Sequence, residues 1–231
     1  IPPDNPPMVF ASWVSDELDA AQRTTMWANG LETLSAIHRI DVTEHDIRRL
    51  PRAGAGEPLV AHDLRRFDAM FTPALRAGTD AIVVEAWQFL QQHPPADGTP
   101  VLCWGDARAG NVIWRDLMPV AVLDWEMANY GDARCDVAWW MWIDKCMSEG
   151  LGMPRLTGLP EPRDVYARWS ALTGLAADGM AYFELFAAVR FAIILELKFV
   201  QMRASHPEMA DMPNFAGKFV PELLEKAAAT R

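Results

Sequence analysis

The stretch 101–126 constrains the fold of this chain more than any other segment. An apolar triplet opens it and leads into a loop that contains two glycines. Two strands follow at 111–114 and 120–123, separated by a cluster of turn-forming residues. The sequence therefore predicts a β-hairpin with Asn111 at the start of one strand and Asp124 just after the end of the other.

Three polar side chains accompany this hairpin. The two ends of an antiparallel pair are neighbours, so the Asn111 amide oxygen and the Asp124 carboxylate can converge on one cation. Mg²⁺ prefers such oxygen ligands, completed by water and substrate phosphates. Asp106 lies in the preceding loop, where it can face a substrate hydroxyl. A single loop Asp is usually an ordinary turn residue, but Asp124 follows a wholly apolar strand, where an acid is either paired or coordinating.

The pattern resembles the catalytic core of the aminoglycoside phosphotransferase and choline kinase group, small-molecule kinases related to protein kinases. That group has His-Gly-Asp, then Asn five residues after the Asp, then a hairpin ending in Asp. The matching residues here are Trp104-Gly105-Asp106, Asn111 and Asp124. The segment 131–138 is similar to the family's Gly-Asp-Pro-x-x-Asp-Leu-Ala, and 34–38 resembles its Leu-x-x-Leu-His helix end.

The resemblance implies a role for each position. Asp106 would accept or orient the proton of the attacking hydroxyl, and Arg108 would neutralise charge on the transferring phosphoryl group. Asn111 and Asp124 would hold Mg²⁺ on the phosphates of ATP. Asp136, near the start of the next helix, has capping as its default role, but the resemblance makes it a structural support that ties this helix to the catalytic loop.

One position departs from the family. Trp104 stands where relatives have His, so the hydrogen bonds with which that His braces the loop must be replaced by packing or by the indole N–H. Trp104 is therefore a second structural-support residue.

The acceptor substrate is left open by the sequence. Asp144, Glu149 and Glu184 are possible ligands for the ammonium groups of an aminoglycoside, although helix-end or solvated acids are the commoner explanation for such residues. Antibiotics, sugars, amino alcohols and acyl-carrier substrates all remain candidates.

Composition excludes several classes of protein. With 231 residues, 51% of them hydrophobic, the chain can form one substantial core. Its net charge of −10 and lack of a basic stripe argue against nucleic acid as a partner. The longest apolar stretch, 182–200, contains four charged residues and predicts a buried helix, not a membrane span. Three cysteines without metal-ligand spacing favour a cytoplasmic protein with reduced thiols.

The expected fold is mainly α with a small β-hairpin (α+β), corresponding to the C-terminal lobe of a protein-kinase-like fold. The longest helix, 178–203, should be central because it is apolar on most sides. A loop is expected at 150–162. Helices are expected from 15–17 to about Ile40, and over 61–77, 80–92, 136–147, 163–172, 178–203 and 214–229.

The nucleotide-covering half of such a kinase is missing from the pattern. No Lys precedes Lys145 to pair with phosphates, and the glycines at 54–56 do not follow a strand or fit a phosphate-covering loop. We therefore expect the N-terminal β lobe to be absent from this chain. Residues 1–14 would be the remnant of the linker after the hinge, and 15–231 the catalytic and substrate-binding lobe.

The leading hypothesis is an ATP- and Mg²⁺-dependent phosphotransferase that moves the γ-phosphate to a hydroxyl of a small molecule, with this fragment inactive alone. One alternative is a pseudokinase-like module that binds a ligand without phosphoryl transfer, which only Trp104 favours. A metal-dependent phosphohydrolase is a third possibility, but such sites usually recruit more carboxylate or His ligands to hold two metals.

Overall fold

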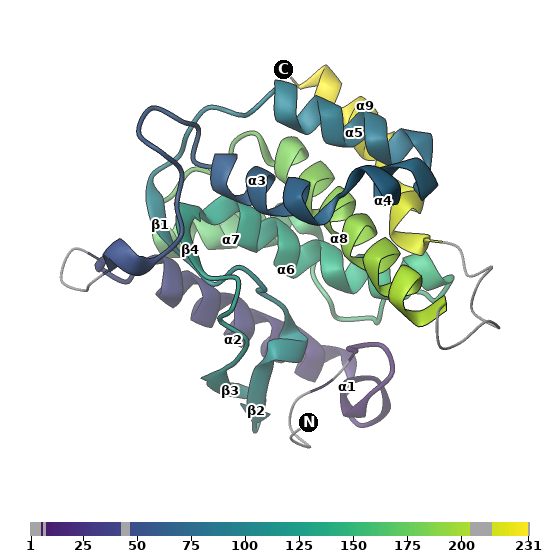
Figure 1. The fold of residues 1–231 in the computed structure, drawn as a ribbon. Helices are drawn as coiled ribbons and strands as arrows, with labels where there is room; N and C mark the ends of the chain where they lie inside the picture. Colours follow the sequence, from purple (N-terminus) through teal and green to yellow (C-terminus); the bar gives the residue numbers. More distant parts are fainter. Residues whose placement is uncertain (1–5, 7, 43–46, 204–213, 231) are drawn as a thin grey trace.

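The computed structural model describes residue 6 and residues 8–42, 47–203 and 214–230. Within these residues the chain is mainly helical, with two small antiparallel sheets of two strands each (Figure 1), which confirms the predicted mainly α fold with a small hairpin. The elements are α1 (Trp13–Asp16), α2 (Ala20–His38), η2 (Ile47–Arg49), α3 (Ala61–Met70), α4 (Pro73–Gly78), α5 (Ala81–Gln92), β1 (Pro100–Cys103), η3 (Ala109–Asn111), β2 (Val112–Arg115), β3 (Met118–Val122), β4 (Asn129–Asp132), α6 (Ala133–Ser148), η4 (Glu149–Leu151), α7 (Pro162–Thr173), α8 (Met180–Arg203), η6 (Phe215–Phe219) and α9 (Val220–Ala229).

The predicted hairpin is present as β2 and β3, with a tighter turn than expected. Val112 pairs with Val122 at its open end. Only Asp116 and Leu117 separate the strands, and their φ angles are 51° and 63°. Two consecutive residues with positive φ are typical of a type I′ turn, whose twist matches that of the flanking strands. Residues 118–119, predicted in the turn, therefore belong to β3.

A second pairing, between β1 and β4, was not expected from the sequence. The strands are antiparallel, with Cys103 opposite Asn129 and Pro100 opposite Asp132. The chain thus leaves β1, forms the loop and hairpin, and returns beside β1 before entering α6 directly. This pairing holds the start of α6 next to the loop that carries Asp106.

Helix α8 is the centre of the core, as predicted. It contacts α3, α5, α6 and α9, and Figure 1 shows it running between α6 and the layer formed by α3, α4 and α5. Phe183, Leu185, Val189 and Ile193 are fully buried. A helix that is apolar on most sides is stable only when neighbours cover it on most sides. Among the described residues, no helix has the length and apolarity needed to cross a membrane.

The helix predicted from 15–17 to Ile40 is in fact two helices. Asp19 starts α2 with a reciprocal cap: its carboxylate accepts the Gln22 backbone N–H at 2.8 Å, and the Gln22 side chain accepts the Asp19 N–H at 2.9 Å. A capping box of this kind marks a helix start, so the chain bends between α1 and α2.

Two other predicted helices are also divided. The helix predicted over 61–77 ends at Met70, and α4 begins at Pro73 after Thr72 caps it. Proline costs no hydrogen bond at the first helical position, so it starts a new helix instead of kinking the old one. The helix predicted over 214–229 begins with the 3₁₀ turn η6 before continuing as α9.

The predicted linker lies partly outside the described residues, which exclude 1–5 and 7. Of its remaining part, Val9 and Val14 are buried, and Val14 belongs to α1. The division into linker and lobe stays a prediction.

Candidate active site

Asp106 lies in the loop after β1, where the preceding backbone conformation requires glycine. Gly105 has a φ of 88°, and a Cβ there would lie 2.2 Å from the Met127 carbonyl oxygen. Two donors hold the Asp106 carboxylate. The Trp139 indole Nε1 donates to Oδ1 at 2.7 Å, and the Asn111 Nδ2 donates to Oδ2 at 2.7 Å.

The surroundings of Asp106 favour its ionised form. Burial alone would raise the pKa of this carboxyl, but the guanidinium groups of Arg108 and Arg190 lower it. Hydrogen bonds from Trp139 and Asn111 act in the same direction, so the pKa lies below its ordinary value. The Arg108 Nε is 3.2 Å from Oδ2. A carboxylate stabilised in this way is charged at neutral pH and is a weak proton acceptor.

Asn111 and Asp124 lie at the open end of the hairpin, as the sequence predicts. The Leu123 N–H donates to the Asn111 carbonyl at 2.8 Å. The Asn111 amide nitrogen also bonds to the backbone oxygen of Asp106 at 3.0 Å, which leaves its amide oxygen as an acceptor or ligand. Asp124 is exposed, has a φ of 61°, and lines the same cavity as Asp106.

These donors fit a magnesium ion. One carboxylate and one amide oxygen are hard ligands, and Mg²⁺ commonly takes few ligands from the protein and the rest from water and phosphates. Within the described part of the chain, no group of three or more His, Cys, Asp or Glu side chains could hold a metal. A self-sufficient protein cage is therefore not found there, and any ion at Asp124 would depend on the substrate to complete its coordination.

Asp136 connects α6 to the loop that carries Asp106. Its Oδ2 accepts the backbone N–H of Trp104 at 2.6 Å, and its Oδ1 accepts that of Gly105 at 2.9 Å. Only 1% of Asp136 is exposed, so these charge-assisted bonds are shielded from water. Asp106 directly follows Gly105 in the chain, so these hydrogen bonds to α6 fix its position.

Asp136 does not cap α6. Asp132 caps α6, because its Oδ1 accepts the Arg134 backbone N–H at 3.0 Å. The same carboxylate pairs with the Arg134 guanidinium at 2.6 Å. Asp136 lies one turn further on, and its carboxylate is thereby free to bind the loop.

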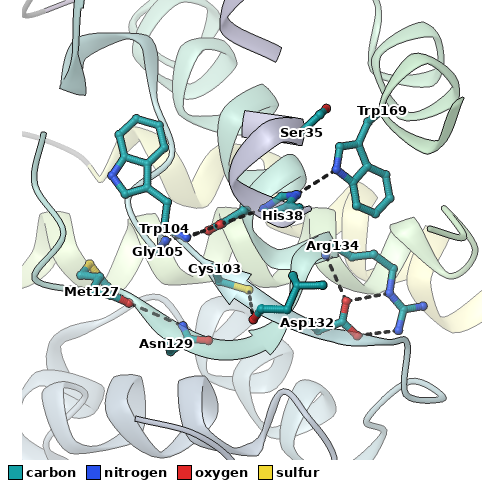
Figure 2. Close-up of polar contacts among 12 residues, drawn as sticks. Ser35, His38, Cys103, Trp104, Gly105, Met127, Asn129, Asp132, Arg134 and Trp169 are labelled. Atoms are coloured by element: carbon teal, nitrogen blue, oxygen red, sulfur yellow. Dashed lines mark hydrogen bonds and ion pairs between the residues drawn. The ribbon is translucent and has the colours of Figure 1, made fainter. Parts of the chain in front are cut away.

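His38 completes the support and was missed as a functional position by sequence reasoning. Its Nε2 lies 3.2 Å from Asp136 Oδ2, and the Trp169 indole Nε1 lies 3.0 Å from its Nδ1. Figure 2 shows His38 between Trp169 and the Trp104–Gly105 segment. An indole nitrogen can only donate, so Nδ1 must accept. The proton of the neutral imidazole is thereby assigned to Nε2, which donates to Asp136.

Trp104 uses its indole as the sequence analysis anticipated. The side chain is buried, with 1% exposed, and its Nε1 donates to the Leu123 carbonyl at 2.8 Å. Leu123 directly precedes Asp124. The residue that replaces the family's His therefore links the Asp106 loop to the end of the hairpin.

A buried cation behind the loop was not expected. Arg190 on α8 is 3% exposed, and its Nη2 donates to the Gly105 carbonyl at 2.5 Å. Its guanidinium lies 3.8 Å from the centroid of the Trp139 ring. Burial lowers the pKa of Arg190, against the effect of nearby carboxylates that raise it. Arg190 therefore contacts both the loop carbonyl and the indole that binds Asp106.

Asp106 opens into a cavity of about 530 Å³. Most of its lining is apolar. The lining includes side chains from α6 (Trp139, Ile143, Asp144, Met147), from α8 (Phe191, Ile194, Leu195, Lys198), from α3 (Arg66), and from the hairpin end and the Asp106 loop (Arg108, Asp124, Glu126).

The three acids proposed as substrate ligands do not gather around Asp106. Asp144 lines its cavity but is buried and paired with Arg155 at 3.1 Å. Glu149 and Glu184 line a separate cavity. Their carboxylates pair with lysine side chains, Lys145 and Lys226 respectively.

Sequence signals existed for some of the missed residues. His38 ends the Leu-x-x-Leu-His motif, but its buried partner 98 positions away cannot be deduced from that motif. Trp139 lies three residues after Asp136 and so on the same face of α6. Arg190 is a cation in the middle of the apolar stretch of α8 and could have been recognised as requiring buried partners.

Comparison with known proteins identifies the family of this chain. A model of the phosphotransferase enzyme family matches residues 6–177, and the chain belongs to that family. A presumed aminoglycoside phosphotransferase from Ralstonia eutropha JMP134 has a similar structure, with a TM-score of 0.72, 18% identity, and coverage of 93% of this chain and 68% of the other. Wild-type aminoglycoside 2′-phosphotransferase-IIIa, solved as a GDP complex, has a TM-score of 0.50, 16% identity and coverage of 93% and 64%.

Two further relatives are a choline kinase and a much longer member of the acyl-CoA dehydrogenase family. Choline kinase LicA from Streptococcus pneumoniae has a TM-score of 0.50 at 12% identity, with coverage of 92% of this chain and 66% of the other. Acyl-CoA dehydrogenase family member 11 from Mus musculus is 21% identical over 160 residues, or 66% of this chain. This chain spans only 20% of that curated relative's length. At these identities the solved structures establish the protein-kinase-like fold alone.

Proposed function

We propose that this chain is the catalytic and substrate-binding lobe of an ATP- and Mg²⁺-dependent kinase that phosphorylates a hydroxyl group of a small molecule. The observation that carries the proposal is the Asp106 carboxylate, which accepts hydrogen bonds from Trp139 and Asn111 at the wall of a cavity. Membership of a phosphotransferase family supports the reaction class.

In this mechanism Asp106 chiefly orients the acceptor. The lowered pKa of Asp106 makes early removal of the hydroxyl proton unfavourable. The carboxylate instead accepts a hydrogen bond from the acceptor hydroxyl and thereby directs a lone pair of the hydroxyl oxygen at the phosphoryl group. The proton passes to Asp106 late, once the bond to phosphorus has formed. Phosphoryl transfer through a loose transition state requires positioning and charge stabilisation more than a strong base.

Arg108 supplies positive charge beside Asp106. Its side chain is 31% exposed, and its Nε lies 3.2 Å from Asp106 Oδ2. A guanidinium can bind the oxygens of a transferring phosphoryl group in a bidentate manner. Asn111 and Asp124 would hold Mg²⁺, which neutralises phosphate charge when it is bound.

The proposal assigns the nucleotide-covering lobe to a segment outside this sequence, because no lysine precedes Lys145. Activity should therefore be measured on a protein that includes such a lobe.

Asp106→Asn tests the assignment directly. We expect turnover, measured as acceptor-dependent ADP release, to fall by roughly 10²–10⁴-fold, with nucleotide affinity nearly unchanged. Asp124→Ala should instead weaken Mg²⁺-nucleotide binding. Asp164→Asn changes an exposed acid on α7 and serves as the control. Normal turnover by the Asp106 variant would remove the basis of the proposal, and nucleotide binding without any turnover by the unaltered protein would favour a pseudokinase-like module.

A further inference from the structure

The cavity beside Asp106 continues between two helices as an apolar groove. Trp139, Ile143 and Met147 are spaced four residues apart on α6, so they form one row. Phe191, Ile194 and Leu195 on α8 also line the cavity. The rise of an α-helix makes the α6 row about 12 Å long, starting at the indole that binds Asp106. A molecule whose hydroxyl reaches Asp106 therefore has its body against apolar side chains.

Among the described residues, the α6 and α8 walls of the groove carry two charged side chains, the exposed Lys198 and one compensated acid. Asp144 is the one acid on the α6 and α8 walls among the described residues, and Arg155 neutralises it at 3.1 Å. Glu126 is near the metal end, next to Asp124. An ammonium group in the groove would thus lose its water without gaining an unpaired carboxylate, which is unfavourable.

We propose that the acceptor is a hydroxylated molecule with an extended apolar body that carries no cation, and that polycationic aminoglycosides and short amino alcohols are poor substrates. This inference rests on the proposed function and specifies its substrate class. Binding would derive mainly from burial of apolar surface along α6 and α8, with specificity for the reacting hydroxyl set by Asp106.

The test uses primary alcohols of two to ten carbons, amino alcohols of the same lengths, and kanamycin. The full-length protein is assayed for ADP release, and each value is compared with that of Asp106→Asn. We expect kcat/KM to rise up to about fourfold with each added methylene, because each buried CH₂ contributes ~0.8 kcal/mol. The rise should stop once the chain fills the groove. In the amino alcohols, the terminal ammonium group should cancel this rise in kcat/KM.

Ile194→Asp and the milder Ile194→Thr should flatten the dependence of kcat/KM on chain length. Val200→Asp is the matched control, because Val200 is on the same helix but is 49% exposed and does not line the groove. Asp106-dependent turnover that prefers kanamycin or amino alcohols, or that ignores chain length, overturns this inference and leaves the proposed kinase intact. Absence of Asp106-dependent turnover with every acceptor overturns both.

Discussion

Replacing Asp136 with Asn should destabilise the protein far more than its small change in shape suggests. Three N–H groups point at this carboxylate: the backbone amides of Trp104 and Gly105, and His38 Nε2. An amide side chain offers one oxygen and one NH₂. Whichever way it is turned, at least one N–H faces the NH₂, and the NH₂ itself lacks an acceptor.

The expected cost follows from this count. At least two buried polar groups lose their partners, at about 1–3 kcal/mol each, so the free energy of unfolding should fall by about 2–6 kcal/mol. Urea unfolding of the wild-type protein and of Asp136→Asn measures this difference in the free energy of unfolding. Asp164→Asn is the control, because Asp164 and its ion-pair partner Arg163 are largely exposed, and it should change stability by less than about 0.5 kcal/mol.

A second substitution tests the tautomer assigned to His38. Trp169→Phe removes the donor that forces Nδ1 to accept. In the Asp136→Asn background, His38 can then carry its proton on Nδ1 and accept the new NH₂ through Nε2. The double variant should therefore be more stable than the sum of the single effects predicts, by ~1 kcal/mol. Effects that add within about 0.5 kcal/mol would refute the proposed hydrogen-bond arrangement.

Two further predictions concern the backbone and pH. In urea unfolding, Gly105→Ala should lower the free energy of unfolding by several kcal/mol more than Gly56→Ala does. Both glycines have positive φ, but of the two only Gly105 would place its Cβ against a backbone carbonyl, at 2.2 Å. Equal costs would refute the close approach. Burial raises the pKa of Asp63 from 3.8 to about 6. The folded state therefore binds the Asp63 proton more tightly than the unfolded state does. As a result, the free energy of unfolding should fall as pH rises through 4–6, by up to ~3 kcal/mol. Asp63→Asn should remove this part of the pH dependence, and an unchanged profile would contradict it.

The sequence predicted the parts of the fold that depend on local patterns. The hairpin, the central position of α8 and the separation of α5 follow from alternation, apolar periodicity and turn residues. The placement of Asn111 and Asp124 at one end of the hairpin follows from antiparallel pairing alone. Helix breaks were harder, because both 15–17 and Asp19 suit a helix start, and only the folded structure shows that α2 begins after Asp19.

Long-range partners could not be predicted in the same way. His38 and Asp136 are 98 positions apart, and Arg190 reaches Gly105 across 85. Such contacts depend on how α2, α6 and α8 pack, and no local pattern encodes that packing. The acids at 144, 149 and 184 illustrate the converse: their residue types suit ammonium binding, but each has a basic partner in the fold.

The support of Asp106 explains how Trp can stand at position 104. The backbone N–H of Trp104 bonds to Asp136, and its indole N–H bonds to the Leu123 carbonyl. One residue thus connects the loop to α6 and to the strand end before Asp124. His38 occupies the other side of Asp136, where Trp169 fixes its proton. Because bracing is distributed over several elements, no single imidazole at position 104 is required to keep Asp106 and Asp124 in a fixed relation.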